Sequence, residues 1–321
     1  MARASAGRRA SWVMMFCAAA ASVLIVAGAA HAQWLGPLIY QENSLYHRIF
    51  VYRYGSVVTL QFGTRHPMLV QSQVDLGNMR RHVQEYSALV FSGLLYQPEP
   101  KRMLLLGLGG GVIPREMRHY FPELQIDVVE IDPAIPPVAE RFFGFRKDDK
   151  LSVHISDGRM FIRKQLRSDP VPKYDLVVLD AYNSDYIPFH LMTREFLEQV
   201  KGILADDGVI VANVLYTSRL CDAELKTFLA VFGRCQVFMG VHSTNAMLVA
   251  PGASAPTLTA KEAGLRAVAL QRKHGFSFDL TTVAMRLRPN TLPDPRAIVL
   301  TDDQAPVNWL RLQETSRMPA P

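Results

Sequence analysis

The chain has 321 residues, of which 49% are hydrophobic and 20% are charged. This composition excludes a disordered chain, a collagen-like repeat and a small disulfide-stapled domain, because apolar residues suffice for a large core and only three cysteines are present. The formal net charge is +6, but three of the positive charges are arginines in the first 32 residues. The remainder carries 32 Lys and Arg against 29 Asp and Glu, a net +3, which is not the charge of a nucleic-acid-binding protein.

Residues 1–32 have the pattern of a secretory signal peptide. Three arginines form a positive start, an apolar stretch over 12–30 follows, and Ala30-His31-Ala32 places small residues where a signal peptidase recognises them. We expect cleavage before Gln33 and export to the periplasm or the medium. The apolar stretch is long for a signal, so an uncleaved anchor stays open, and this segment would then be the chain's contact with a membrane.

Residues 33–96 are predicted to form a small N-terminal β region followed by a linking helix. Alternating apolar residues over 45–70 are interrupted at Tyr54-Gly55, which is the pattern of a β-hairpin. Apolar residues at helical spacing then predict a helix over 74–96, and a proline-rich turn follows it.

Residues 97–312 are predicted to form a Rossmann-like domain, and 313–321 a tail. Strands are expected at 103–107, 124–132, 151–158, 174–182 and 208–216, and helices at 112–121, 136–144, 158–167, 192–204 and 223–233. An antiparallel pair at 235–241 and 245–252, and one or two helices in 256–312, would complete it. Apolar strands that alternate with amphipathic helices indicate a parallel sheet covered on both faces. The predicted fold class is therefore α/β, a Rossmann-like sheet preceded by a small β domain.

Cys221 and Cys235 would remain in an exported chain. The predicted helix between them holds its ends about 15 Å apart. A disulfide needs Cα atoms within about 7 Å of each other, so we expect two free thiols.

Glycines end the first strand of the predicted domain, at the sheet edge where ligands of this fold class bind. Gly107, Gly109 and Gly110 lack side chains, and a ligand can therefore approach the backbone closely. Val112 stands where a dinucleotide fingerprint needs a third glycine, and the Gly-Lys-Ser/Thr of a phosphate-binding loop is absent. Neither NAD nor a P-loop nucleotide is indicated.

Carboxylates follow the next three strands. Glu130 lies about twenty residues beyond the glycines, where a carboxylate accepts hydrogen bonds from ribose hydroxyls. Asp157, followed by Gly158, is placed for the exocyclic amine of adenine, and Asp180 and Asp185 follow the fourth strand. Each Asp alone could be a helix N-cap or a turn residue, but the series favours a nucleoside site. We expect no metal site, because the nine histidines are dispersed.

The runs LLLGLGGGVIPREM, VVEIDP, HISDGRMFI, YDLVVLDAYNSDYIP and DGVIVANV resemble, in this order, the spermidine synthase family of polyamine aminopropyltransferases. TDDQAPVN near the end resembles a tail seen in bacterial members. The resemblance covers roughly 45–312 and implies a small β domain ahead of a Rossmann-like domain. It also implies transfer of an aminopropyl group to a polyamine such as putrescine. The donor, decarboxylated S-adenosylmethionine, would be a co-substrate, with no permanently bound cofactor.

The resemblance implies roles for individual residues. Glu130 would hold the ribose, Asp157 the adenine amine, and Asp180 would align and deprotonate the attacking nitrogen. Tyr86 matches a substrate-site tyrosine, and Asp185 is the second carboxylate after the fourth strand. The partners would be small nucleoside and polyamine molecules, with no nucleic acid, and a homodimer is left open.

Three features depart from the family pattern, one of which is the wider spacing of the paired carboxylates Asp180 and Asp185 after the fourth strand. Gly110 stands where the family usually has an Asp that binds the donor's amine, and Ser87-Ala88 follow Tyr86 in place of an acidic residue. Each lost charge-assisted contact weakens polyamine binding by about 1.5–3 kcal/mol. An exported, non-catalytic nucleoside- or polyamine-binding protein is therefore an alternative. An S-adenosylmethionine-dependent methyltransferase is a weaker one, because Leu105 stands where such enzymes commonly carry an acidic residue.

Overall fold

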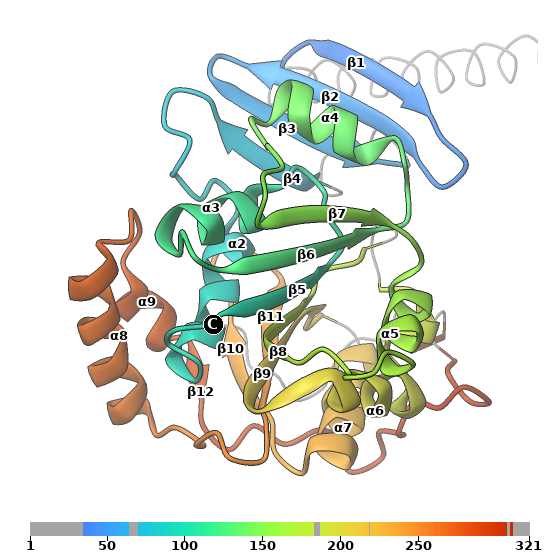
Figure 1. The fold of residues 1–321 in the computed structure, drawn as a ribbon, viewed down its shortest axis with the longest axis vertical. Helices are drawn as coiled ribbons and strands as arrows, with labels where there is room; N and C mark the ends of the chain where they lie inside the picture. Colours follow the sequence, from blue (N-terminus) through green and yellow to red (C-terminus); the bar gives the residue numbers. More distant parts are fainter. Residues whose placement is uncertain (1–34, 64–69, 183–186, 218, 307–308, 311–321) are drawn as a thin grey trace, which may run out of the picture.

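The computed structural model contains two β-sheets, and the larger one carries helices on both faces (Figure 1). The structure describes residues 35–63, 70–182, 187–217, 219–306 and 309–310. The predicted signal segment 1–32 and the predicted tail 313–321 lie outside the described residues. Within these ranges, none of the helices has the length and hydrophobicity to cross a membrane.

The N-terminal sheet consists of four antiparallel strands in chain order. They are β1 (Leu38–Asn43), β2 (Arg48–Tyr54), β3 (Val57–Phe62) and β4 (Val70–Asp75). The predicted hairpin is confirmed, since Gly55 turns the chain between β2 and β3 with φ +59°, a left-handed conformation that glycine adopts easily. Alternate residues of β2 face opposite sides: Ile49 and Val51 join the main core, whereas Phe50 and Tyr52 form a small outer cluster.

The helix predicted over 74–96 is wrong in its first half. Val74 belongs to β4 and pairs with Val58 of β3. The helical part is confined to α2 (Glu85–Leu89) and the 3₁₀ helix η1 (Val90–Leu95). Pairing with a neighbouring strand is a contact between residues distant in sequence, and it outweighs a weak local helical pattern.

The second sheet has the strand order β12-β10-β11-β9-β8-β5-β6-β7. Its strands are β5 (Arg102–Leu106), β6 (Gln125–Glu130), β7 (Leu151–Ile155), β8 (Tyr174–Leu179), β9 (Leu204–Leu215), β10 (Gln236–Met239), β11 (Asn245–Pro251) and β12 (Leu287–Arg288). The five strands from β5 to β9 are parallel, which confirms the predicted parallel sheet. The predicted antiparallel pair is also present, as β10 and β11.

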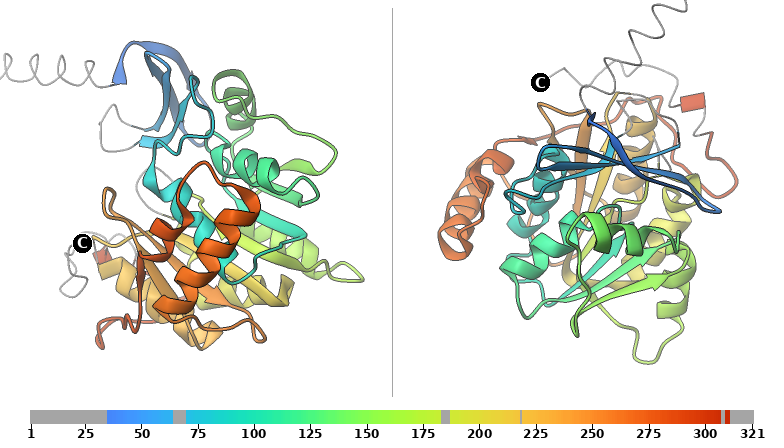
Figure 2. Two further views of the ribbon diagram at one scale, coloured as in Figure 1. Left: turned by 90° about the vertical axis from the view of Figure 1, so that its left-hand side faces the viewer. Right: turned by 90° about the horizontal axis from the view of Figure 1, so that it is seen from above.

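Helices cover both faces of this sheet, as predicted (Figures 1 and 2). They are α3 (Val112–Tyr120), α4 (Ile135–Phe142), α5 (Gly158–Leu166), η2 (Phe189–Leu191), α6 (Arg194–Ile203), α7 (Arg219–Phe232), α8 (Ala260–His274) and α9 (Leu280–Ala284). Along β5, Leu104 and Leu106 belong to the core under α5, α6 and α7, whereas Met103 and Leu105 belong to the core shared with α3, η1 and α8. A strand with apolar residues on both sides needs such cover on both faces.

The order of the strands fixes where a ligand can bind. From the central β5 the chain proceeds outward through β6 and β7, and it then returns to add β8 and β9 on the other side of β5. The connections that leave β5 and β8 therefore diverge at the carboxyl ends of these strands. Sheets of this type bind their ligands in the crevice that such a divergence opens.

Cys221 and Cys235 are free thiols, which confirms the prediction. Cys221 lies in α7 and Cys235 follows the end of this helix, so the helix separates them. Burial raises the pKa of both thiols, which keeps them protonated in the folded chain.

Candidate active site

A glycine turn follows β5 and brings the backbone to the end of β8. Gly107 has φ +94°, and a Cβ atom at this position would lie 2.3 Å from the backbone oxygen of Asp180. Only glycine fits such a close approach. Backbone hydrogen bonds fix the junction: Gly107 N–H donates to Val129 O at 2.8 Å, and Asp180 N–H donates to Leu106 O at 2.9 Å.

A pocket lies at this edge, between the carboxyl ends of the parallel strands and the N-terminal sheet. It is lined by Tyr46, His47, Phe62, Gln71 and Tyr86 on the N-terminal side, and by Leu106–Gly109, Val129–Ile131, Ser156–Gly158, Asp180–Tyr182, Pro188, His190 and Leu191 on the other. Predicted site residues from five separate parts of the chain thus line one cavity. They are Tyr86, Gly107, Gly109, Glu130, Asp157, Gly158 and Asp180.

Glu130 ends β6 and is buried. One carboxylate oxygen accepts the N–H of Leu108 and the other accepts the N–H of Asp132, each at 2.9 Å. Burial raises the pKa of the Glu130 carboxyl group, while the two backbone donors oppose that shift. Each oxygen retains a second lone pair, so the carboxylate can accept two further hydrogen bonds from a ligand in the pocket.

Asp132 connects the pocket to the N-terminal sheet, although it is fully buried. Its Oδ2 atom accepts the hydroxyl of Ser44 and lies 3.0 Å from Nδ1 of His47. A carboxylate can only accept, so His47 donates from Nδ1. The His47 ring also stacks on Phe62, with centroids 4.2 Å apart. These contacts fix His47 in the wall of the pocket.

Asp157 is both a helix N-cap and a residue that lines the pocket. It is the N-cap of α5, with Oδ1 accepting the N–H of Met160 at 2.9 Å. It also lines the pocket, where Oδ2 lies 2.8 Å from Nε2 of His190. The hydrogen bond with His190 is the main cause that lowers the pKa of Asp157. The carboxylate is therefore ionised and remains an acceptor near neutral pH.

Asp180 follows β8 at the pocket wall, and its Oδ1 accepts the amide of Asn213 at 2.8 Å. Burial raises the pKa of the Asp180 carboxyl group from 3.8 to about 7, against the opposing effect of Asn213. Tyr182 lies beside it and donates its hydroxyl to Asn213 O at 2.9 Å. A carboxyl group with a pKa near neutrality can take up and release a proton under ordinary conditions.

The remaining predicted site residues lie in different places. Tyr86 lines the pocket and donates to Gln71 O at 2.9 Å, and burial raises the pKa of its phenol, which stays neutral. Gly110 is buried behind the pocket wall: a Cβ atom there would lie 2.6 Å from Ser72 Oγ and 2.8 Å from Phe143 Cδ1. Gly110 is thus not among the residues that line the cavity. Asp185 lies outside the described residues.

Several pocket residues were not predicted from the sequence, among them the three polar residues His47, His190 and Gln71. None of these three residues directly follows a parallel strand that ends in a glycine or a carboxylate. The prediction of site residues from the strand ends therefore did not include them. Of these three, His190 alone has a sequence feature that could have pointed to the site: it lies just before the helix expected at 192–204, in the loop that follows the fourth strand. Among the described residues, no group of three or more His, Cys, Asp or Glu side chains is arranged to hold a metal ion.

The fold and the pocket define a Rossmann-like protein of the methyltransferase type, with a small antiparallel sheet closing the ligand edge. The family model for the spermine/spermidine synthase domain matches residues 83–244. The chain belongs to the spermine/spermidine synthase family, which confirms the resemblance inferred from its motifs.

Relatives support this assignment. The chain is 35% identical to the polyamine aminopropyltransferase of Vibrio vulnificus over 279 residues, which cover 85% of this chain and 91% of that protein. The structure of a probable spermidine synthase from Corynebacterium glutamicum has a TM-score of 0.63 at 18% identity and covers 88% of this chain and all of that one, a likeness of fold. Human methyltransferase-like protein 13, in complex with SAH, has a TM-score of 0.51 at 29% identity and covers 65% of this chain and 92% of that one.

Proposed function

We propose that this protein transfers the aminopropyl group of decarboxylated S-adenosylmethionine to a polyamine, with putrescine as the first acceptor to test. The observation that carries the proposal is the partly buried Asp180 carboxyl group, which shares one pocket with Glu130 and Asp157. The family to which the chain belongs and its similarity to the Vibrio protein support the same reaction.

In this reaction, the acceptor nitrogen attacks the methylene carbon next to the donor's sulfonium. A C–N bond forms, the C–S bond breaks, and its electron pair stays on sulfur as neutral 5′-methylthioadenosine leaves. The attacking amine must first lose a proton, because an ammonium ion has no lone pair. A carboxyl group with a pKa of about 7 is a strong enough base to accept this proton near neutral pH, and it can release the proton again. Asp180 is therefore our candidate base.

The adenosine part of the donor would lie against the glycine turn. Glu130 would accept hydrogen bonds from the two ribose hydroxyls with the lone pairs that its backbone contacts leave over. Asp157, ionised and beside Gly158, would accept a hydrogen bond from the exocyclic amine of adenine. Gly107 and Gly109 have no side chains that would separate the ligand from the backbone.

The acceptor would lie between the N-terminal sheet and Asp180. Tyr86 and Tyr182 both line this side, and both phenols are partly buried, with pKa values raised by desolvation, and neutral. Aromatic rings suit the methylene chain of a diamine, and their faces attract its ammonium groups. With Ser87-Ala88 in place of an acidic residue, acceptor binding would rest on Asp180 and, by the family resemblance, on Asp185.

A methyltransferase is the second candidate, because the similarity to the human methyltransferase extends beyond the fold to 29% sequence identity. The choice of donor separates the two. Purified protein is given decarboxylated or ordinary S-adenosylmethionine, together with putrescine, cadaverine or agmatine, and the products are identified by mass spectrometry. We expect an aminopropylated amine from the decarboxylated donor alone, and none with Asp180→Asn. A methylated product would overturn the proposal, and tight 5′-methylthioadenosine binding without turnover would leave a binding protein as the better account.

We also propose that the protein is exported, on the grounds of its arginine-rich start, apolar run and Ala30-His31-Ala32. N-terminal sequencing of the protein isolated from its native host should begin at Gln33. Recovery from the cytosol with Met1 or Ala2 at the N-terminus would overturn this proposal. It would also remove the difficulty that a donor made in the cytosol would not reach an exported enzyme.

A further inference from the structure

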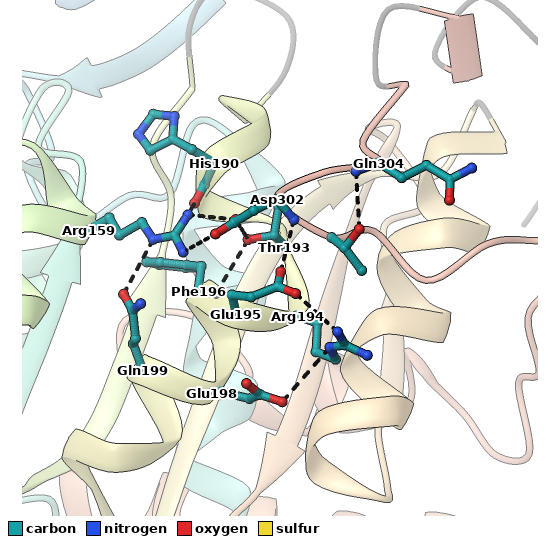
Figure 3. A network of polar contacts seen from close by, with 11 residues as sticks. Arg159, His190, Thr193, Arg194, Glu195, Phe196, Glu198, Gln199, Asp302 and Gln304 are labelled. Atoms are coloured by element: carbon teal, nitrogen blue, oxygen red, sulfur yellow. Dashed lines mark hydrogen bonds and ion pairs between the residues drawn. The ribbon is translucent and has the colours of Figure 1, made fainter.

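The TDDQAPVN run, which the proposed reaction does not use, is tied to the pocket through Asp302. Its carboxylate forms a bidentate ion pair with Arg159, with Nη1 to Oδ1 at 2.7 Å and Nη2 to Oδ2 at 2.6 Å. Arg159 is itself buried, with 8% of its surface exposed. Figure 3 shows the guanidinium group between Asp302 and His190. Paired, planar contacts of this kind fix the orientation of an arginine as well as its position.

The position of Arg159 links this ion pair to the adenine end of the pocket. Arg159 lies in the first turn of α5, two residues after Asp157. Its Nη1 also donates to the backbone oxygen of His190 at 3.4 Å, and its Nε donates to Gln199 at 3.3 Å. His190 in turn contacts Asp157, with its Nε2 atom 2.8 Å from Asp157 Oδ2. Arg159 thus holds the backbone of the residue whose side chain orients Asp157.

Further contacts hold the segment that carries Asp302 in place. Leu300 N–H donates to the Thr227 hydroxyl at 2.9 Å, and Leu300 O accepts from Arg194 N–H at 2.8 Å. Asp302 N–H donates to Glu195 at 2.9 Å, and its carboxylate also accepts the hydroxyl of Thr193 at 2.7 Å. The segment is therefore bound to the start of α6, immediately after η2 and His190 (Figure 3).

We propose that Asp302 is a positioning residue for the nucleoside site, which fixes His190 against Asp157 through Arg159. The inference rests on the proposed function in taking Asp157 as the group that binds the adenine amine. Asp157 is held from one side by the α5 backbone and from the other by His190. Without the ion pair, the backbone of His190 loses the side-chain donor that restrains it, and Asp157 loses one of its two orienting contacts.

The first test compares two neighbouring carboxylates. Asp302→Asn should weaken 5′-methylthioadenosine binding about tenfold in calorimetric titration, because small misplacements of a binding group have effects of this order or larger. Asp303→Asn removes the same charge one residue away, and Asp303 has no ion pair among the described residues. It should change the dissociation constant less than twofold. Equal effects of the two variants would overturn the inference. If Asp302→Asn does not fold, Arg159→Lys, which keeps the charge but loses the bidentate contact, should show the same weakening.

The second test asks whether the effect passes through His190. In a His190→Gln background, Asp302→Asn should cause no further loss of affinity. At pH 8 the Nε2 proton of His190 should be fixed by Asp157, which nitrogen-15 correlation spectra detect as a single tautomer, and His190→Gln assigns the signal. Asp302→Asn should give a mixture of tautomers, and Asp303→Asn should not. A full tenfold loss in the His190→Gln background, or an unchanged tautomer in Asp302→Asn, would show a merely structural role.

These readouts do not depend on turnover. If no aminopropyl product forms but binding and tautomer respond as described, the proposed function is wrong and the positioning role stands. If product forms and neither readout responds to Asp302→Asn, the positioning role is wrong. If the wild-type protein binds no adenosine ligand, the nucleoside site is wrong, and this inference with it.

Discussion

Asp180→Asn tests the proposed base with almost no change of shape. The amide oxygen can keep the 2.8 Å hydrogen bond from Asn213, but the side chain can no longer accept a proton. We expect kcat to fall by about 10²–10⁴, the usual contribution of a positioned general base. Affinity for 5′-methylthioadenosine should be retained, because Glu130 and Asp157 lie elsewhere in the pocket. Steady-state kinetics and calorimetry measure the two effects separately.

The same variant has a predictable effect on stability. The pKa of Asp180 rises from 3.8 to about 7 on folding, which corresponds to about 4 kcal/mol. Because the pKa is raised in the folded state, the stabilising contribution is fully present below pH 3.8 and is lost as the pH rises through 7. The variant has no such loss. Its free energy of unfolding relative to the wild type should therefore increase by about 4 kcal/mol between pH 4 and pH 8.

Urea denaturation of both proteins at intervals from pH 4 to pH 8 measures this difference. The buried Glu224, whose pKa burial raises to about 8, titrates in both proteins and cancels in the comparison. The wild-type kcat/KM should rise over the same range, as Asp180 loses its proton. A difference in unfolding free energy that does not vary with pH would refute the burial argument. An undiminished kcat in Asp180→Asn would show that another group is the base.

Three further predictions concern the pocket, the glycine turn and the thiols. Glu130→Ala should weaken 5′-methylthioadenosine binding by about 2–4 kcal/mol in calorimetry, because the ribose hydroxyls lose both acceptors, and unchanged affinity would mean that Glu130 is only a strand-end residue. Gly107→Ala should destabilise the fold by more than about 3 kcal/mol in urea denaturation, since its Cβ would lie 2.3 Å from a backbone oxygen at φ +94°. Gly233→Ala is the matched control, with φ +73° and no atom within 4 Å, and it should cost only about 1–2 kcal/mol; equal losses would refute the steric argument. Cys221 is buried and Cys235 is partly buried, and both thiols have raised pKa values, so both should react slowly with a thiol reagent in the native protein and rapidly after unfolding; rapid native labelling of Cys221 would contradict its burial.

Patterns along the chain predict the parallel sheet, its covering helices and several of the residues that line the pocket. Near-continuous apolar strands and amphipathic helices are local patterns, and they predicted β5 to β11 and the helices between them. Parallel strands end at the same edge of a sheet, so Gly107, Glu130, Asp157 and Asp180 could be expected to lie together without any knowledge of side-chain contacts. The structure has all four in one pocket.

Features that depend on residues distant in the chain could not be predicted in this way and are seen in the folded structure. Val74 has apolar neighbours at helical spacing, yet pairing with Val58 makes it part of a strand. Gly110 belongs to the glycine run, but Ser72 and Phe143 fill the space that its side chain would need. No local pattern contains these contacts, because each arises where two segments meet after folding. The ion pair of Arg159 with Asp302 joins residues 143 positions apart, and for the same reason only the folded chain reveals it.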